Sequence, residues 1–268
     1  MIRQRILQDL AEAGQTPLSG QVLADRYGVS RNAVWKAIRT LQKNGYPIAA
    51  AGRKGYVLEA GSDILNADEI RSLLDEDSGS IDIRVFTTID STNTEIRRMV
   101  NSGFQGEVLV LSETQSHGRG REGRTFFSPA RTGLYYSLLL RPEAGISQMP
   151  QFSRAAGVAV CEAVLQLTGI RLQIRKVNDL YLDGQKAGGI LSEAFSEDLE
   201  SERITGLVIG VGLNLTTEVF PDSLRGRATS LMATCTRNQL AAEITNQLRR
   251  IDPAKEDALT LAYQEWHA

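Results

Sequence analysis

Residues 117–128 read HGRGREGRTFFS and place Gly118, Gly120 and Gly123 in the spacing G-x-G-x-x-G. That spacing binds dinucleotides only where the first glycine ends a strand and the last opens a helix, so that the pyrophosphate lies at the helix N-terminus. Here polar residues 114–117 separate the preceding apolar run from the first glycine, and the aromatic run after residue 132 is typical of a strand. The stretch therefore predicts a loop between two strands and argues against a doubly wound sheet.

The same loop is rich in arginine, with Arg119, Arg121 and Arg124. Guanidinium groups are planar and permanently charged, and they bind carboxylate and phosphate oxygens through paired hydrogen bonds. We interpret the segment as a mobile anion-binding loop. A solvated, arginine-rich hairpin is the alternative that the residues alone leave open.

The composition is that of a globular protein of up to two domains, with 268 residues, 42% hydrophobic and 23% charged. No apolar run approaches the roughly 18 residues of a membrane span, and charged residues interrupt the start of the chain where a signal peptide would be apolar. We therefore expect a cytoplasmic protein without membrane contact. Two cysteines and two histidines argue against a disulfide framework, a zinc site and a Ser-His-Asp triad, and we predict no metal ligands from the protein.

The charge is distributed unevenly along the chain. Residues 1–60 hold nine Lys and Arg against four Asp and Glu, whereas residues 61–268 hold 21 against 28. A small basic segment joined to a larger acidic one indicates a polyanionic partner for the basic segment.

Residues 1–60 have the pattern of a winged helix-turn-helix domain. Helical periodicity covers 2–14, 20–28 and 31–45, with Ser30 as a plausible N-cap and Val34, Ile38 and Leu41 facing inward. Two short strands around the turn 52–55 would form the wing. A small helical interaction domain with a solvated basic face is the alternative. The residues that we expect to contact DNA are Ser30, Arg31, Asn32, Lys36, Arg39, Arg53 and Lys54.

Residues 61–268 are predicted to form the second domain, after a polar linker-like stretch at 59–70. Strand patterns follow one another with few helices between them, which indicates an α/β (α+β) domain with a mixed, mostly antiparallel sheet. The expected strands are 83–89, 107–113, 133–141, 172–175, 180–184, 188–195 and 204–215, and the expected helices are 90–103, 151–169, 237–251 and 253–267.

Four stretches carry chemistry in combination. They are DSTN at 90–93, the arginine loop after Gln115, NDLYLDGQKAGGILSE at 178–193, and GVGLN ending at Asn214. Taken singly, each has a plain interpretation as a helix cap, a turn or a solvated lysine. In this order, they resemble the bifunctional biotin–protein ligases that also act as biotin operon repressors, and the resemblance runs from about residue 1 to 268.

This resemblance implies a fold like that of class II synthetases and an ATP-dependent, two-step reaction. The carboxylate of biotin attacks the α-phosphate of Mg²⁺-bound ATP to give biotinyl-5′-AMP and pyrophosphate, and a lysine of the biotin carboxyl carrier protein then takes the biotin. Neither step needs an enzyme nucleophile, so positioning and cationic charge supply the catalysis. The family also implies a homodimer that forms with the ligand and binds an inverted-repeat operator.

The resemblance also assigns residues by motif. Catalytic roles fall to Arg121, near the carboxylate and α-phosphate, and to Lys186. The residues expected to bind biotin are Ser91, Thr92, Asn93, Gln115, Gly118, Arg119, Arg121 and Lys186. Those expected to bind ATP or the adenylate are Arg119, Arg121, Arg124, Asn178, Asp179 and Asn214, the last as an adenine contact.

The chain departs from the family pattern in three places. Arg175-Lys176-Val177 stand where the family has Lys-Trp-Pro, Phe126 stands where it often has Trp, and the family usually continues for roughly 50 residues as an SH3-like domain beyond the final helix. We expect biotin binding to persist but weaken, with transfer to the carrier slowed most. Two alternatives follow: a biotin or biotinyl-adenylate sensor without ligation, and a winged-helix regulator for an unrelated carboxylate effector.

Overall fold

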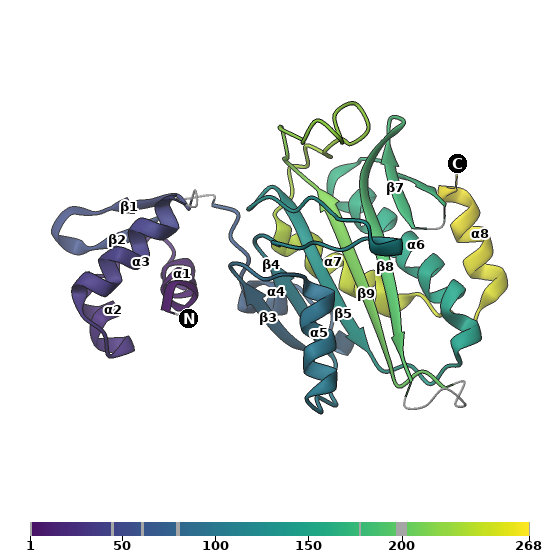
Figure 1. Ribbon diagram of the computed structural model, residues 1–268, viewed down its shortest axis with the longest axis horizontal. Coiled ribbons are helices and arrows are strands. Elements are labelled where there is room, and N and C mark those ends of the chain that lie inside the picture. Colours follow the sequence, from purple (N-terminus) through teal and green to yellow (C-terminus); the bar gives the residue numbers. More distant parts are fainter. Residues whose placement is uncertain are drawn as a thin grey trace. The chain divides into compact units, whose positions relative to one another are not determined.

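The computed structural model describes residues 2–43, 46–59, 62–78, 81–176, 178–196 and 203–267. The chain divides into two compact units, Met1–Asn66 and Ala67–Ala268 (Figure 1). None of the described helices combines the length and apolarity of a membrane span.

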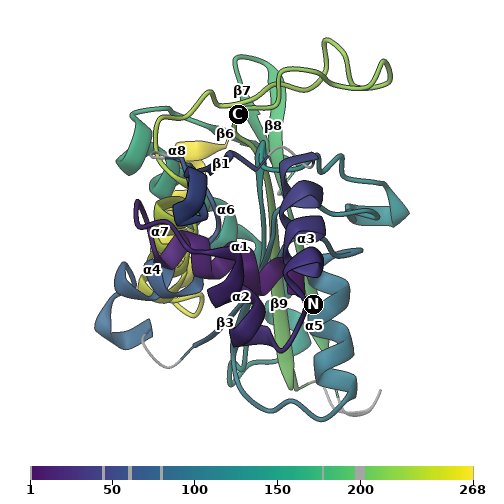
Figure 2. The same ribbon diagram turned by 90° about the vertical axis from the view of Figure 1, so that its left-hand side faces the viewer.

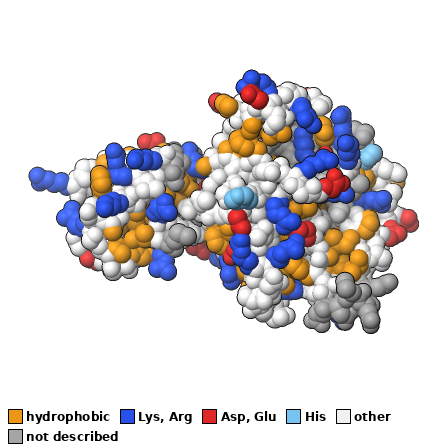
Figure 3. All heavy atoms as spheres, in the orientation of Figure 1, with side chains coloured by type: hydrophobic (Ala, Val, Ile, Leu, Met, Phe, Trp, Pro, Cys, Tyr) orange, Lys and Arg blue, Asp and Glu red, His pale blue; other side chains and the backbone are white. Residues whose placement is uncertain are grey.

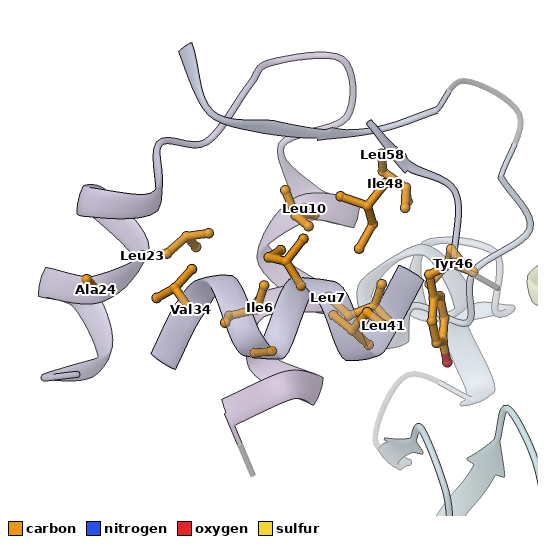
Figure 4. Close-up of a cluster of buried hydrophobic side chains, with 13 residues drawn as sticks. Ile6, Leu7, Leu10, Leu23, Ala24, Val34, Leu41, Tyr46, Ile48 and Leu58 are labelled. Carbon is orange, nitrogen blue, oxygen red and sulfur yellow. The ribbon is translucent and has the colours of Figure 1, made fainter. Parts of the chain in front are cut away.

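The first unit contains a helix-turn-helix. The side-chain oxygen of Ser19 accepts a hydrogen bond from the Val22 amide and caps the start of the second helix. Gly28, in the left-handed conformation, caps its end. Ser30 accepts from the Ala33 amide at 3.1 Å, the N-cap interaction predicted for the third helix. Apolar side chains of all three helices meet in one core (Figure 4). The helices are α1 (Ile2–Glu12), α2 (Gly20–Tyr27) and α3 (Arg31–Lys43).

The wing is a two-stranded antiparallel ribbon in which Ile48 pairs with Leu58. Gly55 lies at φ 117°, and a Cβ atom there would lie 2.0 Å from the Leu18 carbonyl oxygen, so only glycine fits this turn. Leu18 and Tyr56 exchange backbone hydrogen bonds, which tie the wing to the segment before α2. The predicted winged helix is confirmed, with elements β1 (Ile48–Ala50), η1 (Gly52–Lys54) and β2 (Tyr56–Leu58).

The second unit is built on a seven-stranded sheet of order β3-β4-β5-β9-β8-β7-β6. Among the strand pairs of the described residues, β3–β4 is parallel and the other pairs of this sheet are antiparallel, so the predicted mixed, mostly antiparallel sheet is confirmed. The strands are β3 (Asp82–Phe86), β4 (Val108–Ser112), β5 (Gly133–Leu140), β6 (Gln173–Arg175), β7 (Asp179–Leu182), β8 (Gln185–Phe195) and β9 (Gly206–Asn214).

Helices cover the two faces of this sheet unequally. Seen along its edge, the sheet has α4, α6, α7 and α8 on one side and α5 on the other (Figure 2). Because α5 covers only part of its face, the remaining area of β5, β8 and β9 is available for a site. The stretch 59–70 was predicted as a linker, but its last residues begin α4, which packs on α7. The helices are α4 (Ala67–Ser72), α5 (Thr92–Asn101), α6 (Met149–Thr168), α7 (Arg237–Arg250) and α8 (Glu256–Trp266), with short 3₁₀ turns η2 (Glu76–Ser78), η3 (Arg121–Gly123) and η4 (Ile146–Gln148).

Two buried polar contacts join α7 to the central sheet. Arg237 and Glu113 form an ion pair of 2.5 Å with both side chains buried. Tyr136, on β5, shares a hydrogen bond of 3.0 Å with Thr245, and burial raises the pKa of its hydroxyl. Because buried polar groups without partners are costly, these contacts fix where α7 lies.

Candidate functional site

A cavity of about 460 Å³ lies on the same face of the sheet as α5, in the part of that face that the helix does not cover. It gathers residues from five separate parts of the sequence: the start of α5, the arginine loop, Tyr136 on β5, the segment from Lys176 to β8, and β9 with the segment that follows it. Ten residues predicted for the site line it together: Ser91, Thr92, Asn93, Gln115, Arg119, Arg121, Arg124, Asn178, Asp179 and Lys186.

One end of the cavity is neutral and hydrogen-bonding. The Gln115 side-chain oxygen accepts from the Thr92 amide at 2.9 Å, and its amide nitrogen donates to Ser128 Oγ at 2.9 Å. The Ser137 hydroxyl lies 2.7 Å from Thr92 Oγ1 and 2.5 Å from Asn93 Oδ1. These contacts fix the amide and hydroxyl groups in place before any ligand binds, which suits a neutral group with both donors and acceptors.

Ser91 was open to a plain interpretation as a helix cap. It occupies the N-cap position of α5, but its side chain makes no capping hydrogen bond. The side chain is buried and lines the cavity. Its hydroxyl group is therefore available to a ligand.

Glu193, on β8, supports this end from behind, and sequence reasoning did not single it out. Its carboxylate accepts from Asn93 at 2.8 Å and from Arg97 at 2.6 Å, and it lies 3.5 Å from Arg119. It therefore joins the start of α5 to the arginine loop. Ser137 was likewise missed, because one serine inside an apolar strand carries no sequence signal beyond its polarity.

Two glycines of β9, Gly210 and Gly212, line the cavity. A Cβ atom on Gly210 would lie 2.2 Å from Asn93 Oδ1, and one on Gly212 would lie 2.7 Å from the ring of Phe126. No side chain fits at either position without displacing its neighbour. The two glycines therefore let the Asn93 amide and the Phe126 ring lie directly on the backbone of β9, where Phe126 forms an apolar wall of the cavity.

The other end of the cavity is cationic. Arg121 donates to the Asn178 side-chain oxygen at 2.9 Å, and Lys186 pairs with Asp179 at 2.6 Å. Arg124 is mostly exposed and pairs with Glu122 at 3.2 Å. Over the whole lining of the cavity, the cations Arg119, Arg121, Arg124, Lys176, Lys186 and Arg227 outnumber the carboxylates Glu122 and Asp179, and Arg119 lies beside Glu193 near the neutral end. This end therefore suits a ligand with several negative charges.

The arginine loop is a tight hairpin. Phe126 donates to the Gly118 carbonyl at 2.8 Å, and Gly120 donates to the Arg124 carbonyl at 2.7 Å. A Cβ atom on Gly118 would lie 2.4 Å from the Phe126 carbonyl oxygen. The glycine spacing thus serves this hairpin and does not open a helix, as predicted from the flanking residues.

Two predicted contacts fall outside the lining that the described residues provide. Gly118 is enclosed by the hairpin, and Asn214 is buried and donates to the Thr229 carbonyl at 3.0 Å. Asn214 therefore holds the segment after β9, from which Leu224 and Arg227 reach the cavity. Their roles toward biotin and adenine stay predictions.

The Arg175-Lys176-Val177 replacement is described only in part. Lys176 lines the cavity with its backbone in the left-handed region, at φ 52°. Arg175 lies 4.7 Å from the centre of the Tyr181 ring. Val177 lies outside the described residues. A cation therefore reaches the cavity at the position where the family places an indole.

A second surface lies on the first unit. The residues predicted to contact DNA are all exposed: Ser30, Arg31, Asn32, Lys36, Arg39, Arg53 and Lys54. Figure 3 shows many more Lys and Arg than Asp and Glu side chains on the visible face of this unit. The arrangement suits a polyanion.

Each unit of the chain matches a known protein family. Residues 85–214 match the biotin/lipoate A/B protein ligase family, and residues 2–57 match an HTH domain. The bifunctional ligase/repressor BirA of Bacillus subtilis is 34% identical over 232 residues, which cover 86% of this chain and 70% of the relative. BirA of Escherichia coli is 33% identical over 86% of this chain and 71% of its own length.

A solved structure agrees with these matches. The biotin protein ligase from Aquifex aeolicus in complex with biotin and ATP has a TM-score of 0.51 and 26% identity, over 63% of this chain and 71% of that one. The predicted resemblance and fold class are confirmed. From the order of its motifs, its two units and these identities, the chain belongs to the family of bifunctional ligase/repressors named BirA.

Proposed function

We propose that the protein forms biotinyl-5′-AMP from biotin and ATP, transfers biotin to a lysine of a biotin carboxyl carrier protein, and represses transcription in response to biotin. The observation that carries the proposal is the cavity, which joins a neutral, hydrogen-bonding end to a cationic end. Biotin has the matching shape, with a neutral ureido ring at one end and a carboxylate at the other.

Biotin would bind with its ring beside Asn93 and Phe126 and its ureido group at Ser91, Thr92 and Gln115. The preset hydrogen bonds of Thr92 and Gln115 lower the cost of ordering these groups on binding. The carboxylate would then point toward Arg121 and Lys186.

In the first step, a carboxylate oxygen bonds to the α-phosphorus of ATP while the bond to the bridging oxygen of pyrophosphate breaks. Two anions must approach each other, so Arg121 and Lys186 act by cancelling their repulsion and stabilising charge on phosphorus. Lys186 has three donor hydrogens, so it can keep Asp179 and still donate to a ligand oxygen. Arg124 would receive the departing pyrophosphate.

In the second step, the neutral lysine amine of the carrier attacks the carbonyl carbon of the mixed anhydride, AMP leaves with the electrons of the broken C–O bond, and the nitrogen releases a proton to solvent as the amide forms. The arginine loop and the segment after β9 border the cavity and would shield the anhydride from water. Asn178 and Asp179 would hold the adenylate by keeping Arg121 and Lys186 in place.

Mg²⁺ would accompany the ATP phosphates. The described residues contain no cluster of three metal-ligating side chains, and Asp179 is the carboxylate on β7 that lines the cavity. Mg²⁺ is commonly held by one or two carboxylates together with substrate phosphates and water. The residues therefore fit an ion that arrives with ATP, which would screen phosphate charge.

Residues 1–60 would bind operator DNA and residues 61–268 would carry the ligase reaction, both in the cytoplasm, where ATP, the carrier and DNA meet. A winged helix that reads an inverted repeat needs two copies, so we propose that adenylate binding favours a homodimer. DNA affinity should fall steeply with salt, because the cationic surface displaces phosphate counterions.

One assay tests the ligase half: transfer of labelled biotin to the lysine of a carrier domain, with pyrophosphate release followed in parallel. Pyrophosphate release without transfer would instead support a biotin sensor without ligation. Lys176, which stands where the family has tryptophan, favours this alternative. Absence of both, with no biotin-dependent thermal stabilisation, would leave a regulator for another carboxylate.

A further inference from the structure

Trp35 stands out on the recognition helix α3. Its side chain is 50% exposed and lies among charged residues, whereas the apolar positions Val34, Ala37 and Ile38 face the core. A single exposed apolar side chain needs no explanation by itself. Its position and the contacts that hold it carry the inference.

A chain of contacts runs from the indole through Arg39 and Gln42 to the wing. The Arg39 guanidinium lies 5.9 Å from the centre of the Trp35 ring, one helical turn away. Arg39 also donates to the Gln42 side-chain oxygen at 3.3 Å, and Gln42 donates to the Ile48 carbonyl of β1 at 2.7 Å. The Trp35 ring therefore has Arg39 over it, and Arg39 is itself held by Gln42, which lowers the entropic cost of using the ring in a contact.

The surroundings of Trp35 indicate what it contacts. Within α3, all of which the structure describes, there are four cations and no carboxylate: Arg31, Lys36, Arg39 and Lys43. Those charges attract a polyanion and disfavour most protein surfaces. The second helix of a helix-turn-helix enters the major groove with its N-terminal residues toward the base edges, and Trp35 is the fifth residue of α3.

We propose that Trp35 reads sequence by packing against the 5-methyl group of thymine in the major groove. Thymine is the only base that presents an apolar group there, so an apolar side chain discriminates for it. Arg39, stacked near the indole, would carry its charge to a phosphate or to guanine. This inference rests on the proposed repressor function and adds to it a residue that selects a base.

The experiment uses the full chain with Trp266→Phe, because the chain has two tryptophans and Trp266 is buried beside Arg171. A randomised duplex of about 40 base pairs, long enough for two half-sites, is enriched on the protein with biotin and MgATP. The winning duplex is the probe. If no duplex is enriched, the proposed repressor function itself is wrong. That outcome differs from a failure of the Trp35 contact, in which a duplex is enriched but Trp35 does not take part in binding it.

With the probe in hand, Trp35 emission should change on binding, and Trp35→Ala should weaken affinity by about tenfold. Trp35→Ala should leave the salt slope unchanged because it removes no charge, whereas Arg39→Ala should lower it by about one. Leu261 is an exposed apolar residue on α8, and Leu261→Ala is the matched control. It should change neither the affinity for the duplex nor the salt slope. Pyrophosphate release should stay at the level of the unmutated chain in both alanine variants of α3.

Replacing thymines by uracil one at a time removes only the methyl group. At one thymine in each half-site, uracil should cost the unmutated protein as much affinity as Trp35→Ala does, and should cost Trp35→Ala nothing further. Unchanged Trp35 emission, or unmutated affinity in Trp35→Ala, would overturn the contact. Equal uracil effects in both proteins would overturn the base reading.

Discussion

Lys186 and Asp179 form an ion pair of 2.6 Å across the neighbouring antiparallel strands β8 and β7. The register between these strands shifts between Leu180 and Tyr181, so that Lys186 lies opposite Tyr181. Such a bulge re-aims side chains at the edge of a site. Here the cation lies at the cavity, held by a carboxylate that keeps it in place.

Removing either central cation should slow adenylation. We expect Lys186→Ala and Arg121→Ala each to lower the rate of pyrophosphate release by about 10² or more, the usual cost of one preorganised charge contact. Lys255→Ala, an exposed lysine before α8, is the matched control and should keep full activity. Near-unmutated release in either cavity variant would remove that residue from its assigned role.

Gly210→Ala should weaken biotin binding. The added methyl group would lie 2.2 Å from Asn93 Oδ1 and must displace that side chain, and overpacking of this kind costs about 1–3 kcal/mol. Calorimetric titration should show an affinity lower by about tenfold. Gly20→Ala, whose methyl group would meet only Tyr56 at 3.6 Å, should bind biotin normally. Unchanged affinity in Gly210→Ala would mean that Asn93 does not take part in binding.

Asn214→Ala should affect ATP more than biotin. Its side chain donates to the Thr229 carbonyl and so holds the segment that carries Leu224 and Arg227 to the cavity. We expect KM for ATP to rise severalfold with little change in biotin affinity. Equal losses for the two ligands would show that Asn214 supports the whole sheet edge and not the nucleotide end.

The Asp90 carboxylate should stabilise the fold in a pH-dependent way. Hydrogen bonds from Arg98 lower the pKa of Asp90, burial opposes this, and the Ser91 amide lowers it further. A lowered folded pKa gives stability that is present above the unfolded pKa, about 3.9, and is lost as pH falls through the folded value. The melting difference between the unmutated chain and Asp90→Asn should therefore be constant near neutral pH and shrink below about pH 4.

Trp266 emission in a Trp35→Phe background reports melting of the larger unit alone, because Trp266 lies on α8. A melting difference that grows on acidification would contradict the assigned sign. Arg84→Ala, which removes an exposed pairing with Asp82, should show little pH dependence and serves as the control.

Patterns that repeat along the chain predicted the fold well. Val34, Ile38 and Leu41 recur at helical spacing, and all three are buried. Alternating and apolar runs located β3, β4, β5 and β9 to within a few residues. The start of β8 was predicted at residue 188, three residues late, because Gln185 and Lys186 are polar and pair with residues 226–229, which no local pattern reveals.

The site was predictable only where side chains carry their own chemistry. The charged side chains of Arg121 and Lys186 indicate anion binding by themselves, and the structure places both in one cavity. Glu193 and Ser137 act through Asn93, and contacts between residues 44 to 100 positions apart leave no trace in a single sequence. The adenine contact of Asn214 stays a prediction, and its side chain also donates to the Thr229 carbonyl, which the sequence did not indicate.

The buried ion pair between Arg237 and Glu113 sets the smallest piece of this chain that could be excised as a biotin-binding domain. The region that matches the ligase family ends at residue 214, but the partners of Glu113 and Tyr136 lie beyond it, at Arg237 and Thr245. Cutting at residue 214 would leave a buried carboxylate without its guanidinium, at a cost of about 3–5 kcal/mol. A minimal recombinant biotin domain must therefore run at least through α7, and α8, which buries Leu259, Tyr263 and Trp266, belongs with it.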